Sequence, residues 1–160
     1  PQLEGFTSLS LDVKDGDNLV KSLDIYFDDT NLDSVCPNYS FNTSCAKKTQ
    51  HKLTTLPEYM AISVRRFNYS NNGCVKSDAH LEFDLSVDMA KYSEVKHRTK
   101  YSLYGVVIHS GNECKSGHYY SYVKSKNGNW YLANDSEVKH VEDINDVLAQ
   151  QAYMLFYKRN

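Results

Sequence analysis

Apolar and polar residues alternate in several short segments of this 160-residue chain. A two-residue period is typical of a β-strand with one buried face, whereas a helix repeats its apolar positions every three to four residues. Asn127-Gly128 is the dipeptide most typical of a tight hairpin turn, and it lies between two such segments. The alternation predicts strands at residues 9–13, 59–67, 101–109, 119–124, 130–133 and 152–157.

Only two segments predict helices, and both are short. Asp17-Asn18 is expected to cap a helix whose apolar residues run from Leu19 to Phe27. Apolar residues from Val141 to Leu148 predict a second, shorter helix. The sequence therefore favours an α+β fold, mainly an antiparallel β assembly, that is part of a larger domain. Three other segments are less distinct: a loop is expected at 28–46, a strand at 47–56, and 80–92 is ambiguous.

Charge and hydropathy exclude two classes of partner. The chain has 18 Lys and Arg against 20 Asp and Glu, a formal net charge of −2, whereas nucleic-acid-binding domains show a basic excess. Its apolar runs are far shorter than the roughly 20 residues that span a bilayer. Neither nucleic acid nor a membrane is therefore an expected partner. The chain begins with Pro1 and shows no signal-peptide pattern, so we expect an upstream segment that this sequence does not include.

The cysteines and the glycosylation sequons leave open a secreted, disulfide-bonded glycodomain. Sequons begin at Asn38, Asn42 and Asn68. Such matches arise by chance where Asn and Ser are abundant, and the cysteine content is well below that of disulfide scaffolds. The secreted alternative is therefore the less favoured one. Two disulfides are arithmetically possible among the four cysteines, Cys36, Cys45, Cys74 and Cys114.

Candidate catalytic residues lie around the predicted hairpin. A loop with two glycines leads to His118 at the start of one strand, and the returning strand ends in Asn134-Asp135. An imidazole that is held through one nitrogen by Asn or Asp has a fixed tautomer, and its other nitrogen can act as a base. The alternative is a structural histidine beside an Asn-Asp pair that closes a turn.

The length of the hairpin loop decides which of the two residues reaches His118. A two-residue loop at Asn127-Gly128 would place Asp135 on the face of His118. A three-residue loop would need a positive φ at Gly128 and would place Asn134 there instead. One residue of slip exchanges the two candidates because side chains alternate between faces.

Several segments resemble motifs of the ubiquitin-specific proteases. Upstream, LPEYMAISVRRF (56–67) is similar to the "LP..L.I.LKRF" strand of that family, and FTSLSLDV (6–13) is similar to "F..LSLDI". From Phe6 to Arg159 these motifs follow the family order, so the chain is identified as a member. Resemblance to the His box and C-terminus rests on YSLYGVVIHSG (101–111), GHYYSY (117–122), WYLANDSEV (130–138) and AYMLFY (152–157).

The resemblance implies a papain-like fold of thumb, palm and fingers, with residues 1–160 forming the fingers-and-palm half. It also implies hydrolysis of the bond after the C-terminal glycine of ubiquitin by a Cys-His-Asn/Asp triad. Ubiquitin and ubiquitinated proteins are the implied partners, and the implied location is intracellular, in the nucleus with its nucleolus or in the cytoplasm. A catalytically inactive module that still binds ubiquitin is the alternative.

Individual roles follow from the same resemblance. His118 corresponds to the general base, Asn134 to the third member of the triad, and Asp135 to the neighbour that assists it. Gly117 and Tyr119 correspond to the channel that receives the ubiquitin tail. The resemblance favours Asn134 as the partner of His118, so we predict the three-residue loop. His109, on the preceding strand, is interpreted as structural.

The chain departs from the family pattern in two places. It has no N-terminal nucleophile box, and Cys114 is an unfavourable substitute because a nucleophile aimed by histidine generally comes from a distant segment. The nucleophile is therefore expected in the N-terminal half of the same catalytic domain, a further partner, and this chain alone is expected to be inert. Eight residues separate Cys36 from Cys45, which is wrong for a C-x-x-C zinc pair, so we expect no metal and no other cofactor.

Overall fold

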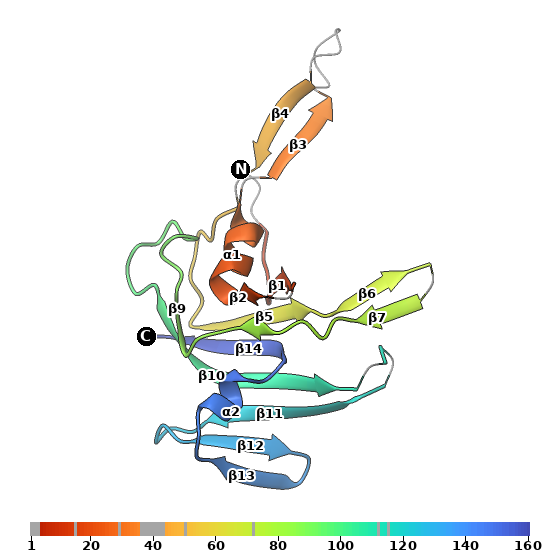
Figure 1. Cartoon of the computed structure of the whole chain (residues 1–160). Coiled ribbons are helices and arrows are strands. Elements are labelled where there is room, and N and C mark those ends of the chain that lie inside the picture. Colours follow the sequence, from red (N-terminus) through yellow and green to blue (C-terminus); the bar gives the residue numbers. More distant parts are fainter. Residues whose placement is uncertain are drawn as a thin grey trace.

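One mainly antiparallel sheet organises the chain (Figure 1). The computed structural model describes residues 4–14, 16–28, 30–35, 44–49, 51–71, 73–111, 113–114 and 116–160, with the backbone alone at 30–35, 44–49 and 70. The strand order is β1-β5-β14-β10-β11-β12-β13, and β9 pairs with β10. The bounds are β1 (Leu9–Asp12), β5 (Tyr59–Arg65), β9 (Ser86–Asp88), β10 (Lys100–Ser110), β11 (His118–Lys124), β12 (Trp130–Asn134), β13 (Glu137–Val141) and β14 (Ala152–Arg159).

Three smaller strand pairs and two short helices complete the described part of the chain. The helices are α1 (Leu19–Phe27) and α2 (Asn145–Leu148). Within the described residues, no helix has the length and apolar character to cross a bilayer. The strand pairs are β2 (Asp17–Asn18) with β8 (Leu81–Glu82), β3 (Thr30–Val35) with β4 (Ser44–Thr49), and β6 (Phe67–Ser70) with β7 (Gly73–Lys76).

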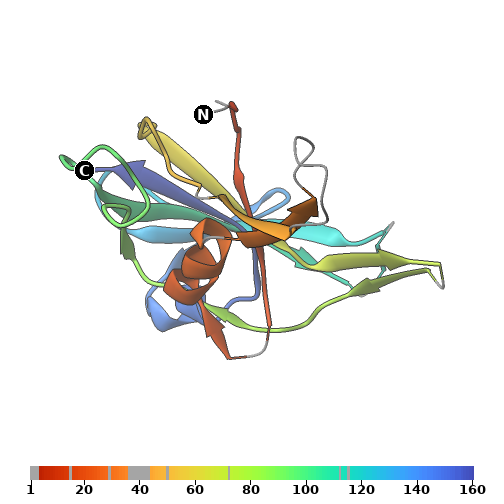
Figure 2. The same cartoon turned by 90° about the horizontal axis from the view of Figure 1, so that it is seen from above.

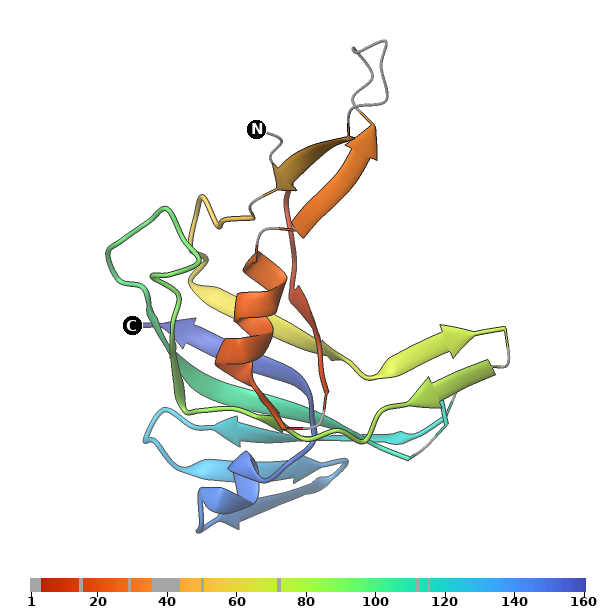
Figure 3. The same cartoon turned by 45° about the horizontal axis from the view of Figure 1, so that its top comes forward.

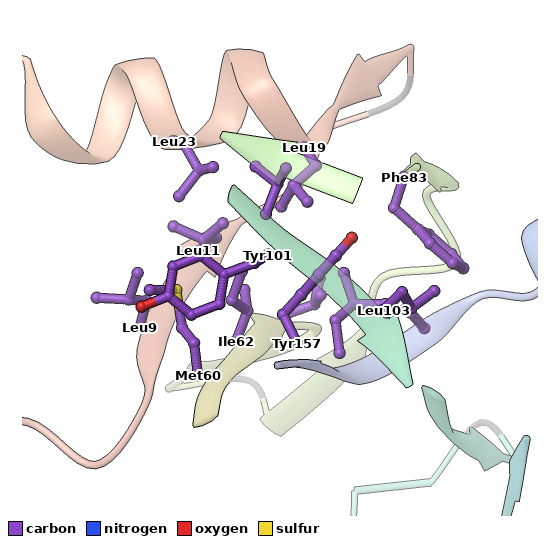
Figure 4. Close-up of a cluster of buried hydrophobic side chains, with 14 of the residues drawn as sticks. Leu9, Leu11, Leu19, Leu23, Met60, Ile62, Phe83, Tyr101, Leu103 and Tyr157 are labelled. Carbon is purple, nitrogen blue, oxygen red and sulfur yellow. The ribbon is translucent and has the colours of Figure 1, made fainter. Parts of the chain in front are cut away.

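The core lies between the sheet and the helices. In β5, Met60, Ile62 and Val64 are buried, as the two-residue period predicted. Ile62 faces Leu155 across the β5–β14 ladder, so successive strands place apolar residues in the same layer. Figure 4 shows side chains of α1 and of the strands converging on this layer.

The two helices lie on one side of the main sheet (Figure 2). On the other side, the ring of Tyr104 lies 5.9 Å from that of Tyr59 and 6.2 Å from that of Phe156, measured between centroids. Tyr59 is 58% exposed. The sheet therefore carries aromatic side chains on the face away from the helices.

Most predicted elements are confirmed. The predicted strands correspond to β1, β5, β10, β11, β12 and β14, and the first helix begins where it was expected. Its cap is Asn18, whose Oδ1 accepts a hydrogen bond from the backbone N–H of Lys21 at 2.8 Å. Two pairings depart from the antiparallel expectation, because β1 runs parallel to β5 and β2 runs parallel to β8.

The loop predicted at 28–46 is wrong in part. Its two ends pair as the β3–β4 hairpin, from Thr30 with Thr49 to Val35 with Ser44, and this hairpin projects away from the main sheet (Figure 3). The strand predicted at 47–56 extends only to Thr49, and Leu53 forms an isolated bridge with Ser93. A ladder formed by two local segments needs no buried face, so apolar alternation gives it little signal.

Strand pairings that the sequence did not predict include β6 with β7 and β12 with β13. β6 and β7 pair as a hairpin, from Phe67 with Lys76 to Ser70 with Gly73. Val141, assigned to the second helix from its spacing, instead ends β13, and α2 contains four residues. The turn between β12 and β13 holds Asp135 at φ 51°, a conformation that Asp tolerates better than most residues do. After this turn the chain forms β13, the edge strand of the main sheet, and then continues to α2.

Candidate active site

The β11–β12 hairpin has the three-residue loop and the register that were predicted. Tyr122 faces Leu132 and Lys124 faces Trp130. The loop is closed by a hydrogen bond from the N–H of Ser125 to the carbonyl of Asn129 at 2.8 Å, and Gly128 adopts φ 93°. A residue without Cβ suits this left-handed conformation.

This register brings His118 and Asn134 together. His118 is the first residue of β11 and Asn134 is the last residue of β12. Nε2 of His118 lies 2.5 Å from Oδ1 of Asn134. Because an amide oxygen only accepts, Nε2 carries the proton and Nδ1 keeps a free lone pair. His118 is exposed, so Nδ1 is available to a thiol brought by another segment. The geometry is that of an oriented base, and its catalytic role stays a prediction.

Asp135 occupies a different position from the one that a two-residue loop would give it. It lies in the exposed turn between β12 and β13, while its neighbour Asn134 holds the His118 ring. Its predicted assisting role stays a prediction.

Tyr120 supports the strand that begins with His118. The rings of these two residues are 6.3 Å apart between centroids and inclined by 27°. The Tyr120 hydroxyl donates to Oε1 of Gln150, just past α2, at 3.2 Å. Burial raises the pKa of Tyr120, so the hydroxyl keeps its proton at neutral pH. Alternation placed Tyr120 on the face of His118, but no sequence signal connected it with Gln150.

His109 is buried on the opposite face, in keeping with a structural role. Its ring lies 4.7 Å from that of Tyr119 and 5.3 Å from that of Phe67, between centroids. Burial and the nearby charge of Lys76 lower the pKa of His109, so the ring is neutral at neutral pH.

Gly117 owes its identity to close packing against His109. A Cβ at this position would clash with the His109 ring and would lie 2.7 Å from the carbonyl oxygen of Ser110. The backbone just before His118 therefore lies directly on the end of β10. Tyr119, the other predicted tail-binding residue, is 52% exposed. Contact of either residue with a ubiquitin tail stays a prediction.

The described cysteine side chains are paired with each other. Cys74 and Cys114 form a disulfide with their Cα atoms 6.1 Å apart. Their pairing was left open by the sequence, and in this state Cys114 has no thiol with which to attack a substrate. Cys36 and the side chain of Cys45 lie outside the described residues, so the absence of zinc there stays a prediction. Elsewhere in the described part, no three His, Cys, Asp or Glu side chains form a group that could hold a metal ion.

Comparison with protein families and curated proteins gives one consistent result. A family model described as ubiquitin carboxyl-terminal hydrolase matches residues 17–157. Ubiquitin carboxyl-terminal hydrolase 23 of Arabidopsis thaliana is 31% identical over an alignment 165 positions long that covers 99% of this chain and 19% of that protein. Ubiquitin carboxyl-terminal hydrolase 8 of Saccharomyces cerevisiae is 31% identical, over 97% of this chain and 35% of that protein. The chain thus spans only a minor part of these relatives.

Solved structures agree with the sequence comparison. A SAGA DUB module that contains Ubp8, Sgf11, Sus1 and Sgf73 includes a chain with a TM-score of 0.84 and 31% identity, over 97% of this chain and 36% of that one. Another such module, bound to monoubiquitin, gives a TM-score of 0.83 and 32% identity, over 97% of this chain and 35% of that one.

Proposed function

The chain belongs to the ubiquitin carboxyl-terminal hydrolase family, and from this membership we propose that it is the base-supplying part of a cysteine deubiquitinase. The observation that carries the proposal is the hydrogen bond from Nε2 of His118 to Oδ1 of Asn134, which leaves Nδ1 free at an exposed position. The monoubiquitin bound to a similar module supports ubiquitin as the substrate class. The proposed location is intracellular, in the nucleus or the cytoplasm.

In the proposed mechanism, Nδ1 of His118 removes the proton from a cysteine thiol. The thiolate attacks the carbonyl carbon of the C-terminal glycine of ubiquitin, and His118 returns the proton to the leaving amine. Water, deprotonated by the same imidazole, then hydrolyses the thioester. Asn134 holds the ring in the required tautomer throughout, and Asp135 assists from the adjacent turn. Gly117 and Tyr119 border the channel for the ubiquitin tail.

The nucleophile is proposed to come from an N-terminal half of the same catalytic domain. Support comes from the disulfide that occupies both cysteine side chains in the described part of the chain. It also comes from the length comparison, because the chain covers 19% of one relative and 35% of another. Most of each relative therefore lies outside the matched region, which leaves room for a second half.

The test is hydrolysis of a ubiquitin C-terminal fluorogenic reporter by the full-length protein. His118→Gln removes the base and is expected to lower kcat by about 10³-fold or more. His140→Gln is the matched control, because His140 is an exposed histidine on β13 of the same sheet. Full activity in His118→Gln, or equal losses in the two variants, would overturn the proposed role.

The alternative, an inactive ubiquitin-binding module, makes a different prediction for the same preparation. The full-length protein would then bind ubiquitin but release no fluorophore, and His118→Gln would leave binding unchanged. We favour the enzyme because the oriented His118–Asn134 pair has no use in binding alone.

A further inference from the structure

The β6–β7 hairpin is linked, by a disulfide and by hydrogen bonds, to the connecting segment that lies between Ser110 at the end of β10 and His118 at the start of β11. Figure 1 shows both reaching the same side of the molecule. Cys74 of β7 is linked to Cys114 in the connecting segment. Nζ of Lys76, also in β7, donates to the carbonyl oxygens of His109 at 2.8 Å and Gly111 at 2.7 Å. The hairpin therefore holds both the start of this segment and a point near its middle.

This connecting segment leads directly into the proposed active site at His118. Cys114 is four residues before His118. A Cβ at Gly111, which has φ 112°, would lie 3.3 Å from Cα of Gly117, so the two ends of the segment meet. His118 itself is paired with Ser110 in the β10–β11 ladder. The disulfide thus constrains the segment at Cys114. The β10–β11 ladder fixes the backbone at both ends of the segment, at Ser110 and at His118.

We propose that the Cys74–Cys114 disulfide is a redox-sensitive link that controls how firmly the channel-bordering segment before His118 is held, and thereby the affinity for the ubiquitin tail. This inference rests on the proposed function. In a reducing intracellular compartment, disulfides that form are usually transient or redox-sensing rather than structural. Both cysteines are half-buried, so the link is accessible to a small reductant.

The switch requires a dithiol reductant, and its chemistry balances as ordinary thiol–disulfide exchange. A thiolate of the reductant attacks one cysteine sulfur, the S–S bond breaks, and the other cysteine leaves as a thiolate. The second thiolate of the reductant then attacks the reductant's own sulfur in the mixed disulfide, so the bond to the protein cysteine breaks, that cysteine leaves as a thiolate, and the reductant departs as a cyclic disulfide. Two electrons pass to the protein, and the two thiol protons end on Cys74 and Cys114.

Reduction is expected to change substrate binding more than chemistry. The contact between His118 and Asn134 depends on the β11–β12 register and does not involve the linked segment. A freed segment must be ordered again each time the tail binds, which weakens binding. Loss of the link should therefore raise KM about three- to tenfold and leave kcat within about twofold.

The first experiment needs no activity. The full-length protein is equilibrated in oxidised or reduced glutathione buffer, alkylated, and analysed by mass spectrometry. Cys74 and Cys114 should resist alkylation in the oxidised buffer and react after addition of a dithiol. Hydrogen exchange at residues 111, 113–114 and 116–117 should be about tenfold faster in Cys74→Ser/Cys114→Ser than in the oxidised protein. Val75→Ser, on the same strand but outside the link, should exchange like the wild type.

The second experiment measures KM and kcat for the ubiquitin reporter in the oxidised buffer. KM is independent of the active fraction, so oxidation of some catalytic thiol does not distort it. A raised KM in Cys74→Ser/Cys114→Ser, but not in Val75→Ser, supports the inference. Free cysteines in the oxidised buffer, unchanged exchange or an unchanged KM would overturn it. A full-length protein that forms the link but cleaves no ubiquitin reporter would instead refute the proposed function.

Discussion

At the residue scale, the contact between His118 and Asn134 predicts an order of effects. Asn134→Ala frees the imidazole to change tautomer and orientation, and we expect kcat of the full-length protein to fall by about 100-fold. Asp135→Ala should cost less than about tenfold, because Asp135 lies in the turn and Asn134 occupies Nε2. Reporter kinetics on the two variants measure this order. The reverse order would mean that Asp135 holds the ring during catalysis.

Loss of the buried Arg66 should lower the stability of the fold strongly. It is 1% exposed, and its guanidinium donates to the carbonyl oxygens of Ala152 at 2.8 Å, Ala79 at 2.6 Å and Ser77 at 3.1 Å. Burial lowers the pKa of Arg66, but the group remains charged at neutral pH. Arg66→Met keeps much of the volume, yet it leaves these carbonyl groups without their donor.

We expect Arg66→Met to lower the free energy of unfolding by about 3 kcal/mol. Arg65→Met is the matched control, because the Arg65–Asp12 ion pair is exposed and should contribute less than about 1 kcal/mol. Urea unfolding of protein that contains this chain measures both values. Equal losses for the two adjacent arginines would contradict the buried role of Arg66.

The sequence predicted the contact between two residues of the same hairpin, but it did not predict contacts between residues that are far apart in the sequence. His118 and Asn134 could be paired because turn length and strand alternation fix their positions together. Gln150, Lys76 and the pairing of Cys74 with Cys114 depend on how β14, β7 and the β10–β11 connection lie in space. No local period records that arrangement, so only the three-dimensional structure brings these residues to the site.

At the scale of elements, Gly128 is the residue that the β11–β12 register requires. Its φ of 93° is unfavourable for a residue with Cβ, so Gly128→Ala should cost about 1–2 kcal/mol of stability. Gly5→Ala is the control, because a Cβ there meets nothing within 4 Å and its φ is not in the left-handed range. Thermal unfolding of the two variants makes the comparison. A loss no larger than that of Gly5→Ala would show that the loop tolerates alanine.

Strands with a buried face could be predicted, and strands defined only by local pairing could not. β5 was predicted because Met60, Ile62 and Val64 must all avoid water. β13 has four exposed residues among its five, so nothing in its sequence separates it from a loop. Its one half-buried residue, Val141, instead suggested a helix. Tertiary context decided these elements, as it does for many edge strands.

The β3–β4 hairpin raises a prediction about metal. Cys36, next in sequence after β3, and Cys45, in β4, lack the spacing of a zinc pair, so the chain is expected to bind zinc well below stoichiometry. Elemental analysis of the purified chain, without added metal, measures this directly. A stoichiometric zinc ion that disappears in Cys36→Ser would contradict the prediction and would assign the hairpin a structural metal.

At the scale of the whole molecule, the described fold is one main sheet and three small strand pairs, with two helices on one side of the main sheet and the exposed His118 imidazole at its surface. The proposed function requires a thiol at Nδ1 of His118, and the described cysteine side chains are joined to each other. We therefore propose that a part of the catalytic domain outside this chain completes the site. Family membership and an exposed, oriented histidine together suggest that activity belongs to an assembly of two halves.

The last prediction tests whether His118 and the nucleophilic cysteine come from two separate halves of the catalytic domain. The chain of residues 1–160, after circular dichroism verifies its β structure, should hydrolyse no ubiquitin C-terminal reporter. Addition of the N-terminal half, with its cysteine, should restore turnover, and His118→Ala in this chain should abolish it again. Turnover by the isolated chain that survives Cys114→Ala but not His118→Ala would contradict both the two-half reading and Cys114 as nucleophile. Turnover lost in Cys114→Ala would make Cys114 the nucleophile, which requires the link to Cys74 to be open during catalysis.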